Sequence, residues 1–187
     1  MRYILSFLFI LGLVILAFIL VFTSFSHSGT PIKPSQPLVS YADTATQVEV
    51  TIDGPINADQ LHYELQMTVG TNLSQINLEK GYQGVIVNSA SYTNNASSYA
   101  EFLRALDLAG FAKGNKNPKS DNDPRGFCAN GNRYTYQIVN SNGNDIENFW
   151  STSCGGQGTF EGVPGAILNL FIAQIPDYGT VVKGSDF

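Results

Sequence analysis

Few of the side chains that carry enzymatic chemistry occur in this chain: its 187 residues include two cysteines, two histidines and one tryptophan. A zinc site usually has four Cys or His ligands. Outside a proline-rich segment that contains His27, only the two cysteines and His62 remain. His62 is also the only base for a catalytic thiol, and its alternation with Leu61 and Tyr63 predicts a surface position on a strand. We therefore expect no metal, no cofactor and no thiol chemistry.

Three glycine-containing functional motifs are missing as well. The chain has no Gly-x-Ser-x-Gly turn of the kind that presents a hydrolase serine. The glycine-rich stretch 155–162 lacks the Gly-Lys-Ser/Thr ending of a phosphate-binding loop and the spacing of a dinucleotide fingerprint. It is better interpreted as a turn between a strand and a helix. Residues 121–126 resemble the start of a calcium loop, but Arg125 and Asn132 occupy ligand positions, which favours a solvated loop.

Positive charge is scarce beyond the first residues. From Thr23 onward nine Lys and Arg residues face fifteen Asp and Glu residues, a net charge of −6, which argues against nonspecific binding of nucleic acid. Five of the nine basic residues nevertheless fall within 113–133. This cluster could bind an acidic protein or an anionic polymer of the cell envelope, but Asp121 and Asp123 dilute its charge, so a plain hydrophilic loop is the favoured interpretation. Its members are Lys113, Lys116, Lys119, Arg125 and Arg133.

The one long apolar run stands at the start of the chain. Ile4 to Phe22 is 19 residues without a charge, and as a helix it would span about 28 Å, close to the hydrocarbon thickness of a bilayer. This length favours a transmembrane anchor at residues 1–22, because the apolar region of a cleaved signal peptide is usually about 7–15 residues long. Cleavage near Ser26 is the alternative. Arg2 precedes the run, so we expect a single-pass protein of the cell membrane with a cytoplasmic N-terminus and the C-terminal bulk outside.

Composition divides the remainder into two parts. Residues 23–47 contain three prolines, many Ser and Thr and few large apolar residues. Such a segment cannot bury enough surface to offset its ordering entropy, so we expect a flexible tether. Residues 48–187, about 140 in number, suit one extracytoplasmic domain with one hydrophobic core.

Alternating polarity predicts strands in this domain. Residues 48–52 and 61–69 alternate on either side of turn residues, as in a β-hairpin, and 84–92 is a further candidate strand. A second hairpin is expected over 132–154, because Asn142-Gly143 is a strong turn signal between two alternating segments.

Helical periodicity appears in two other places. A helix is predicted over 97–109, after a cap residue such as Asn95 and before the stop signal Gly110. A second helix is predicted between Pro164 and Pro176. Because strands and helices are segregated along the chain, we expect an α+β domain in which two helices pack on one face of an antiparallel sheet.

The two cysteines, Cys128 and Cys154, are predicted to form a disulfide. Both lie in the part that we expect outside the cell, where thiols oxidise. If the strands of the second hairpin pair about Asn142-Gly143, a small bend brings the two residues within the separation that a disulfide requires.

The last ninety residues resemble a known family in their layout. They run from "YAEFLRALDLAGF" through "RYTYQIV" to "AILNLFIAQIP", and this order of a helix, a tyrosine-rich hairpin and a short helix is similar to that of emfourin-type domains. The resemblance implies a small α+β module of a family that includes inhibitors of thermolysin-like metalloproteases. It carries over no binding residue. The chain also resembles membrane-anchored bacterial proteins with a short exported domain.

Two hypotheses for function follow. The absence of an acid–base constellation favours a non-catalytic extracytoplasmic module that binds another molecule. The alternative is a cell-envelope hydrolase that uses loop carboxylates such as Asp121, Asp123 or Glu161 as acid and base.

Overall fold

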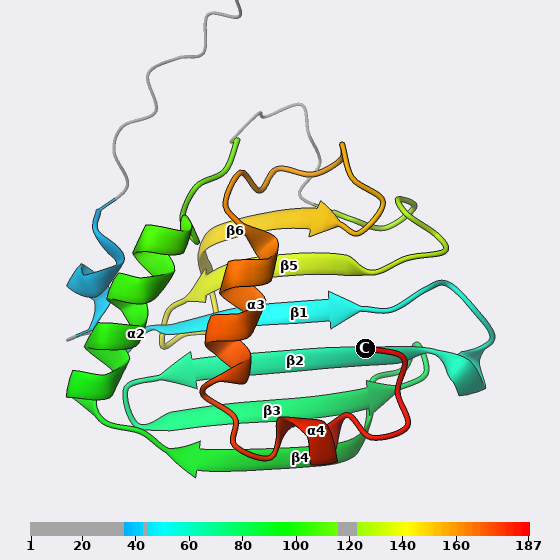
Figure 1. Ribbon diagram of the computed structural model, residues 1–187, viewed down its shortest axis with the longest axis horizontal. Coiled ribbons are helices and arrows are strands. Elements are labelled where there is room, and N and C mark those ends of the chain that lie inside the picture. The colour runs from blue at the N-terminus through cyan, green and yellow to red at the C-terminus, as the bar shows by residue number, and fades with distance from the viewer. Residues whose placement is uncertain (1–35, 43–44, 116–122) are drawn as a thin grey trace, which may run out of the picture. The chain divides into compact units, whose positions relative to one another are not determined.

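One antiparallel sheet of six strands organises the described part of the chain (Figure 1). The computed structural model describes residues 36–42, 45–115 and 123–187. The order of the strands across the sheet is β4-β3-β2-β1-β5-β6. The strands are β1 (Gln47–Asp53), β2 (Tyr63–Gly70), β3 (Leu73–Lys80), β4 (Val85–Thr93), β5 (Arg133–Val139) and β6 (Asp145–Thr152).

The helices lie between and after these strands and cover one face of the sheet. α2 (Ala96–Ala109) carries the chain from β4, at one edge, to β5, which pairs with β1. α3 (Pro164–Ile172) and the short α4 (Tyr178–Val181) follow β6, and all three helices lie on the same face (Figure 1). The predicted α+β architecture, with helices on one face of an antiparallel sheet, is confirmed.

Alternation along the strands separates a core face from a polar face. The core-facing side chains of β1 are Val48, Val50 and Ile52. On the opposite face amide and carboxylate side chains bond to one another: Gln66 Nε2 donates to Glu49 Oε1 at 2.7 Å, and Asn77 Nδ2 donates to Gln66 Oε1 at 3.4 Å. This polar face carries the site described below.

Local signals account for the limits of the helices. The side chain of Asn95 accepts a hydrogen bond from Ser98 N at 3.0 Å and caps α2, and Gly110, with φ of 82°, ends the helix in a left-handed conformation that suits glycine. α3 ends at Ile172, earlier than predicted. Tight turns follow, in which Gln174 N donates to Phe171 O, and they keep Ile175 in the core.

The prediction of a tether over 23–47 is wrong for its last residues. Residues from Gln36 onward belong to the compact unit that extends to Phe187. Leu38, in the 3-10 helix η1 (Leu38–Tyr41), is fully buried in the core. One large apolar side chain therefore docks a segment whose composition is otherwise that of a linker.

The expected anchor at residues 4–22 lies outside the described residues, as does the first part of the expected tether. Across residues 36–42, 45–115 and 123–187 no helix is long and apolar enough to cross a membrane.

The sequence pattern does not predict β3 (Leu73–Lys80). β3 alternates, but its core face begins with a polar residue, Ser74, which is buried ahead of Ile76 and Leu78. This weakens the apolar pattern by which strands are recognised.

Candidate binding site at the end of the polar sheet face

A row of charged side chains crosses four neighbouring strands where β1 ends. In the register of the sheet, Arg133 on β5 pairs with Asp53 on β1, Asp53 pairs with Glu64 on β2, and Glu64 pairs with Glu79 on β3. Directly opposed residues on neighbouring strands share a face, with Cβ atoms about 5 Å apart. The four side chains therefore form one continuous row, which we call the charged row.

Arg133 and Asp53 form a buried ion pair at one end of the charged row. Arg133 Nε lies 2.8 Å from Asp53 Oδ2, and Arg133 Nη2 lies 2.7 Å from Asp53 Oδ1 and donates to Gly54 O at 2.7 Å. The Arg133 side chain is only 3 % exposed. Its third nitrogen, Nη1, is buried without a hydrogen-bond partner among the described residues.

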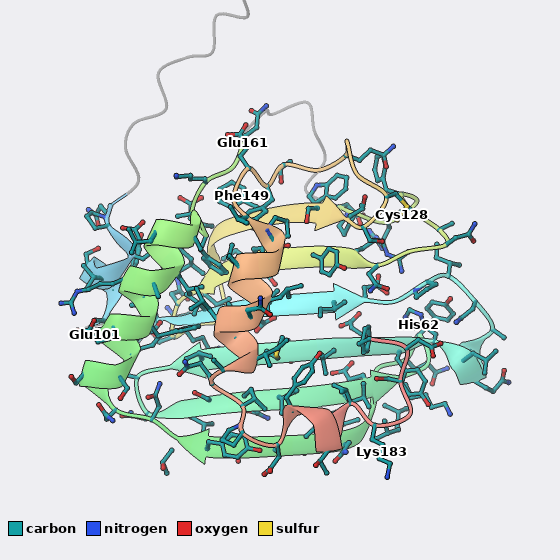
Figure 2. The ribbon with its side chains drawn as sticks, in the orientation of Figure 1. His62, Glu101, Cys128, Phe149, Glu161 and Lys183 are labelled. Carbon is teal, nitrogen blue, oxygen red and sulfur yellow. A yellow bond between two sulfur atoms is a disulfide. The ribbon has the colours of Figure 1, made fainter. Side chains whose placement is uncertain are left out.

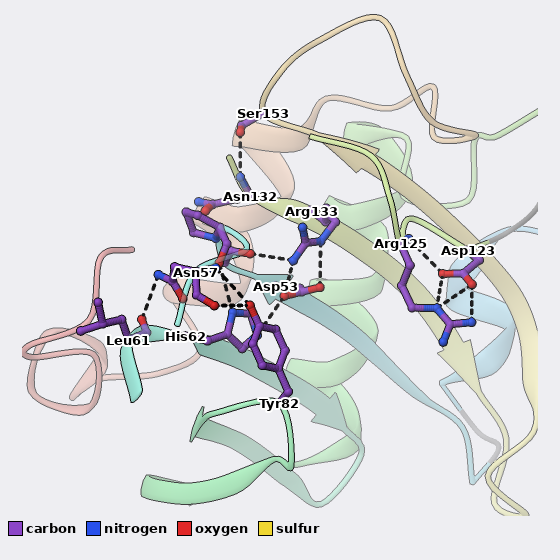
Figure 3. A network of polar contacts seen from close by, with 12 residues as sticks. Asp53, Asn57, Leu61, His62, Tyr82, Asp123, Arg125, Asn132, Arg133 and Ser153 are labelled. Carbon is purple, nitrogen blue, oxygen red and sulfur yellow. Dashed lines mark hydrogen bonds and ion pairs between the residues drawn. The ribbon is translucent and has the colours of Figure 1, made fainter. Parts of the chain in front are cut away.

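His62 adds a second contact to Asp53. Its Nε2 lies 3.3 Å from Asp53 Oδ1, and its Nδ1 lies 3.2 Å from Pro55 O. The ring stacks on Tyr82 with 4.1 Å between centroids. Figure 3 shows the two stacked rings beside the Asp53–Arg133 pair.

The predicted surface position of His62 is therefore wrong. β2 begins at Tyr63 rather than at Leu61, so His62 precedes the strand and is free of its alternation. Its ring is buried against the carboxylate of Asp53. Leu61, which was predicted to face the core, is exposed in the 3-10 helix η2 (Asp59–Leu61).

Tyr82 is held in place from two sides. Its hydroxyl donates to Asn57 O at 2.8 Å and accepts from Asn57 N at 3.1 Å, and its backbone N donates to Asp59 Oδ1 at 2.9 Å. The ring is nevertheless 53 % exposed. A large aromatic surface is thus fixed in position and open to solvent.

These groups line a pocket of about 460 Å³. Its walls are the charged row, His62, Tyr82, the turn from Gly81 to Gly84, and the segment that contains Arg125 and Gly126. The volume falls within the range of about 300–1,000 Å³ that is common for small-ligand sites.

Glu64 lies in the middle of the charged row, where its ionisation is opposed. Burial, as the largest effect, raises the pKa of Glu64 from 4.5 to about 7. Negative charge raises it further, and Arg133 lowers it only in part. The carboxylates that act on it are Asp53, Glu79 and Glu49, in decreasing order of effect. A cation in the pocket would relieve this opposition.

Exposed apolar side chains lie at and beside the pocket. Ile56 and Tyr82 line it, and Ile86 on β4 pairs with Glu79 of the charged row and shares its face of the sheet. Each is 50–55 % exposed. We call this set the apolar rim; it consists of Ile56, Tyr82 and Ile86.

The predicted disulfide between Cys128 and Cys154 is confirmed, with 5.7 Å between Cα atoms. It joins the loop before β5 to the segment after β6. The same loop is tied to the other wall of the pocket, because Ile56 N donates to Ala129 O at 2.8 Å. Figure 2 shows Cys128 and His62 at the same end of the sheet. The crosslink therefore stabilises the loop that brings Arg125 to the pocket.

Of the predicted basic cluster the structure describes three members, and two of these, Arg125 and Arg133, line the same pocket. Lys113 is exposed after α2, and its carbonyl accepts from Glu161 N. Arg125 lies at the pocket wall and pairs with Asp123. Arg133 is not part of an exposed loop at all, because it is the first residue of β5 and is buried against Asp53. Lys116 and Lys119 lie outside the described residues.

The carboxylates proposed for a hydrolase do not form a site in the described residues. Asp123 is half-buried on a loop and accepts a hydrogen bond from Arg125 Nε at 2.8 Å. Glu161 does not line the pocket; Figure 2 places it beyond the β6 edge, away from His62. Asp121 is outside the described residues. In the part of the chain that the structure describes, no three His, Cys, Asp or Glu side chains are placed to hold a metal ion.

No family model, curated protein or solved structure matches the chain. The resemblance of the last ninety residues to emfourin-type domains therefore stays a prediction.

Proposed function

We propose that the chain is a non-catalytic extracytoplasmic binding module and that the pocket is its ligand site. The observation that carries this proposal is the pairing of a polar pocket with the apolar rim. Isolated exposed apolar residues are common, but a group of them around a pocket is typical of an interaction site. In such a site the polar groups orient the ligand, and the apolar residues around them contribute binding free energy.

The arrangement of the charged row favours binding over catalysis. The carboxylate of Asp53 contacts both Arg133 and His62. Because these three side chains bind one another, they are poorly placed to act on a substrate. Asp53 and His62 therefore support the pocket wall. Glu64, Glu79, Tyr82 and the unpaired Nη1 of Arg133 are then the groups that are available to a ligand.

A hydrolase that uses Glu64 and Glu79 is the second candidate. The observation in its favour is the pKa of Glu64, about 7, which suits a general acid at neutral pH. Glu79 on the neighbouring strand would be the partner carboxylate. Hydrolysis of an envelope polysaccharide that is lost in both Glu64→Gln and Glu79→Gln would favour this candidate over a binding role.

The extracytoplasmic location is part of the proposal. The apolar run at residues 4–22 supports an anchor, and the disulfide supports an oxidising compartment. Treatment of intact cells with an impermeant protease should remove the C-terminal domain; full protection of that domain would refute the location.

Site-specific photo-crosslinking tests the binding role. A photoreactive benzoylphenylalanine in place of Ile86, which is 55 % exposed on the apolar rim, should give a discrete adduct in the source cells. The matched control is the same replacement of Leu108, which is more exposed and lies on α2. Adducts at neither position, or equal adducts at both, would refute a binding site at the rim.

A further inference from the structure

We infer that the pocket binds a lysine or arginine side chain of a protein partner, with the carboxylates of Glu64 and Glu79 around its charge and the buried Nη1 of Arg133 donating to a carbonyl oxygen of the same ligand. This inference rests on the proposed function and names the ligand of that site.

The carboxylates supply the first part of the argument. Among the described residues, Arg133 is the Lys or Arg that pairs with the charged row, and it pairs with Asp53. Arg125, which also lines the pocket, pairs with Asp123 outside the row. Glu64 and Glu79 stand opposite each other on neighbouring strands and have no ion-pair partner among the described residues. Like charges in directly opposed positions destabilise a sheet. A cation between them turns this repulsion into attraction.

Arg133 supplies the second part, independently of the acidic side chains. Its Nη1 is a buried donor without a partner among the described residues, on a side chain that lines the pocket and is 3 % exposed. A buried donor left unpaired is costly, and more so when it belongs to a charged group. A ligand that brings an acceptor would satisfy this donor. A free anion would meet the repulsion of Glu64 and Glu79, whereas a neutral carbonyl oxygen would not.

Tyr82 and the apolar rim supply the third part. The Tyr82 ring is held in place by Asn57 and His62 and is open to solvent at the pocket wall. Aromatic faces attract ammonium and guanidinium groups and pack against their alkyl stems. Ile56 and Ile86 are exposed nearby and suit the apolar side chains that flank a basic residue in a protein surface.

Other ligand classes satisfy fewer of these groups. A neutral sugar offers hydroxyls and a ring for Tyr82, but it leaves two carboxylates without a counter-charge. A bare metal ion offers no acceptor to Arg133, and no three ligating side chains are suitably placed among the described residues. A basic residue in a peptide has both a cationic end and a carbonyl oxygen.

Capped tripeptides test the inference against the full-length chain in neutral detergent micelles. The probes are acetyl-Ala-Lys-Ala-amide and acetyl-Ala-Arg-Ala-amide, with the glutamine tripeptide as the neutral analogue, butylammonium as a cation without a carbonyl, and a chitin oligosaccharide as a neutral sugar. Calorimetry or NMR titration should give an affinity for the basic peptides at least about tenfold above that for the glutamine peptide or for butylammonium.

Glu79→Gln should reduce the affinity for the lysine peptide by about tenfold, whereas Glu101→Gln, which removes an exposed carboxylate on α2, should leave it unchanged. Equal affinities for the lysine and glutamine peptides, or preference for the sugar, would overturn the inference. If rim adducts persist in that case, the binding role stands and only the cationic ligand is wrong; if they are also absent, both proposals fail. The wild-type titrations decide the matter even if Glu79→Gln does not fold.

Discussion

Replacement of Glu64 by glutamine should stabilise the protein at pH 8 and leave its stability unchanged at pH 4.5. Burial and neighbouring carboxylates raise the pKa of Glu64 from 4.5 to about 7. The folded protein therefore holds this proton more tightly than the unfolded chain does. The stability that the protonated carboxyl contributes is fully present below pH 4.5 and is lost as the pH rises through about 7. Glutamine cannot ionise, so the variant avoids this loss.

The magnitude follows from the same pKa. A rise from 4.5 to about 7 corresponds to about 3 kcal/mol for a fully buried group. Glu64 is only partly buried, and contact with water reduces the effect, so we expect Glu64→Gln to raise the free energy of unfolding at pH 8 by about 2 kcal/mol. At pH 4.5 the difference from the wild type should be within about 0.5 kcal/mol.

Urea unfolding of the full-length chain in micelles measures this difference. Trp150 is the only tryptophan of the chain and is buried, so its fluorescence reports loss of the core. Glu101→Gln is the control, because Glu101 is exposed on α2, where it pairs with Arg104 three residues away. A variant at Glu64 that is destabilised at pH 8, or whose effect does not change between pH 4.5 and pH 8, would refute the account of the charged row.

Three further predictions concern stability and use the same unfolding measurement. Asp53→Asn leaves the buried Arg133 without its counter-charge and should cost about 3 kcal/mol; a loss below about 1 kcal/mol would mean that water or another group compensates the guanidinium. Removal of the disulfide by Cys128→Ser with Cys154→Ser should cost about 3.5 kcal/mol, since the bond closes a loop with a sequence separation of 26, and an unchanged midpoint would contradict this. Leu38→Ala should cost about 3 kcal/mol because Leu38 is fully buried, whereas a true tether residue would tolerate it.

Local patterns predicted most of the fold. The alternation of Val48, Val50 and Ile52 indicated β1, and the cap at Asn95 with the stop at Gly110 indicated the limits of α2. Each of these features depends on residues within a few positions of one another. The segment around Leu38 has too few apolar residues to indicate that it packs into the core. A single buried side chain produces no hydrophobic periodicity.

The site was beyond such reasoning because it depends on register across the sheet. Glu64 and Glu79 are polar residues on alternating strands. Neither strand alone indicates that the two residues are directly opposed, or that Arg133 lies two strands away from Glu64. Charged residues near Arg133 in the sequence suggested an exposed basic loop. One signal for the ion pair was present in the sequence. Asp53 and Arg133 each lie at one end of an apolar alternating segment, and a charge that is buried there requires a counter-charge.

The position of β1 between β2 and β5 leaves one edge of β1 unpaired in the nascent chain during translation. β1 pairs with β2 a few residues later, but its other neighbour, β5, comes from residues about 80 positions further along. During translation, at about 5–20 residues per second, the meander of β1 to β4 is complete several seconds before Val139 is made. In that interval one side of β1 offers unpaired backbone groups that can recruit a strand from another polypeptide. Aggregation should therefore be most severe for stalled or truncated chains that end between Thr93 and Arg133.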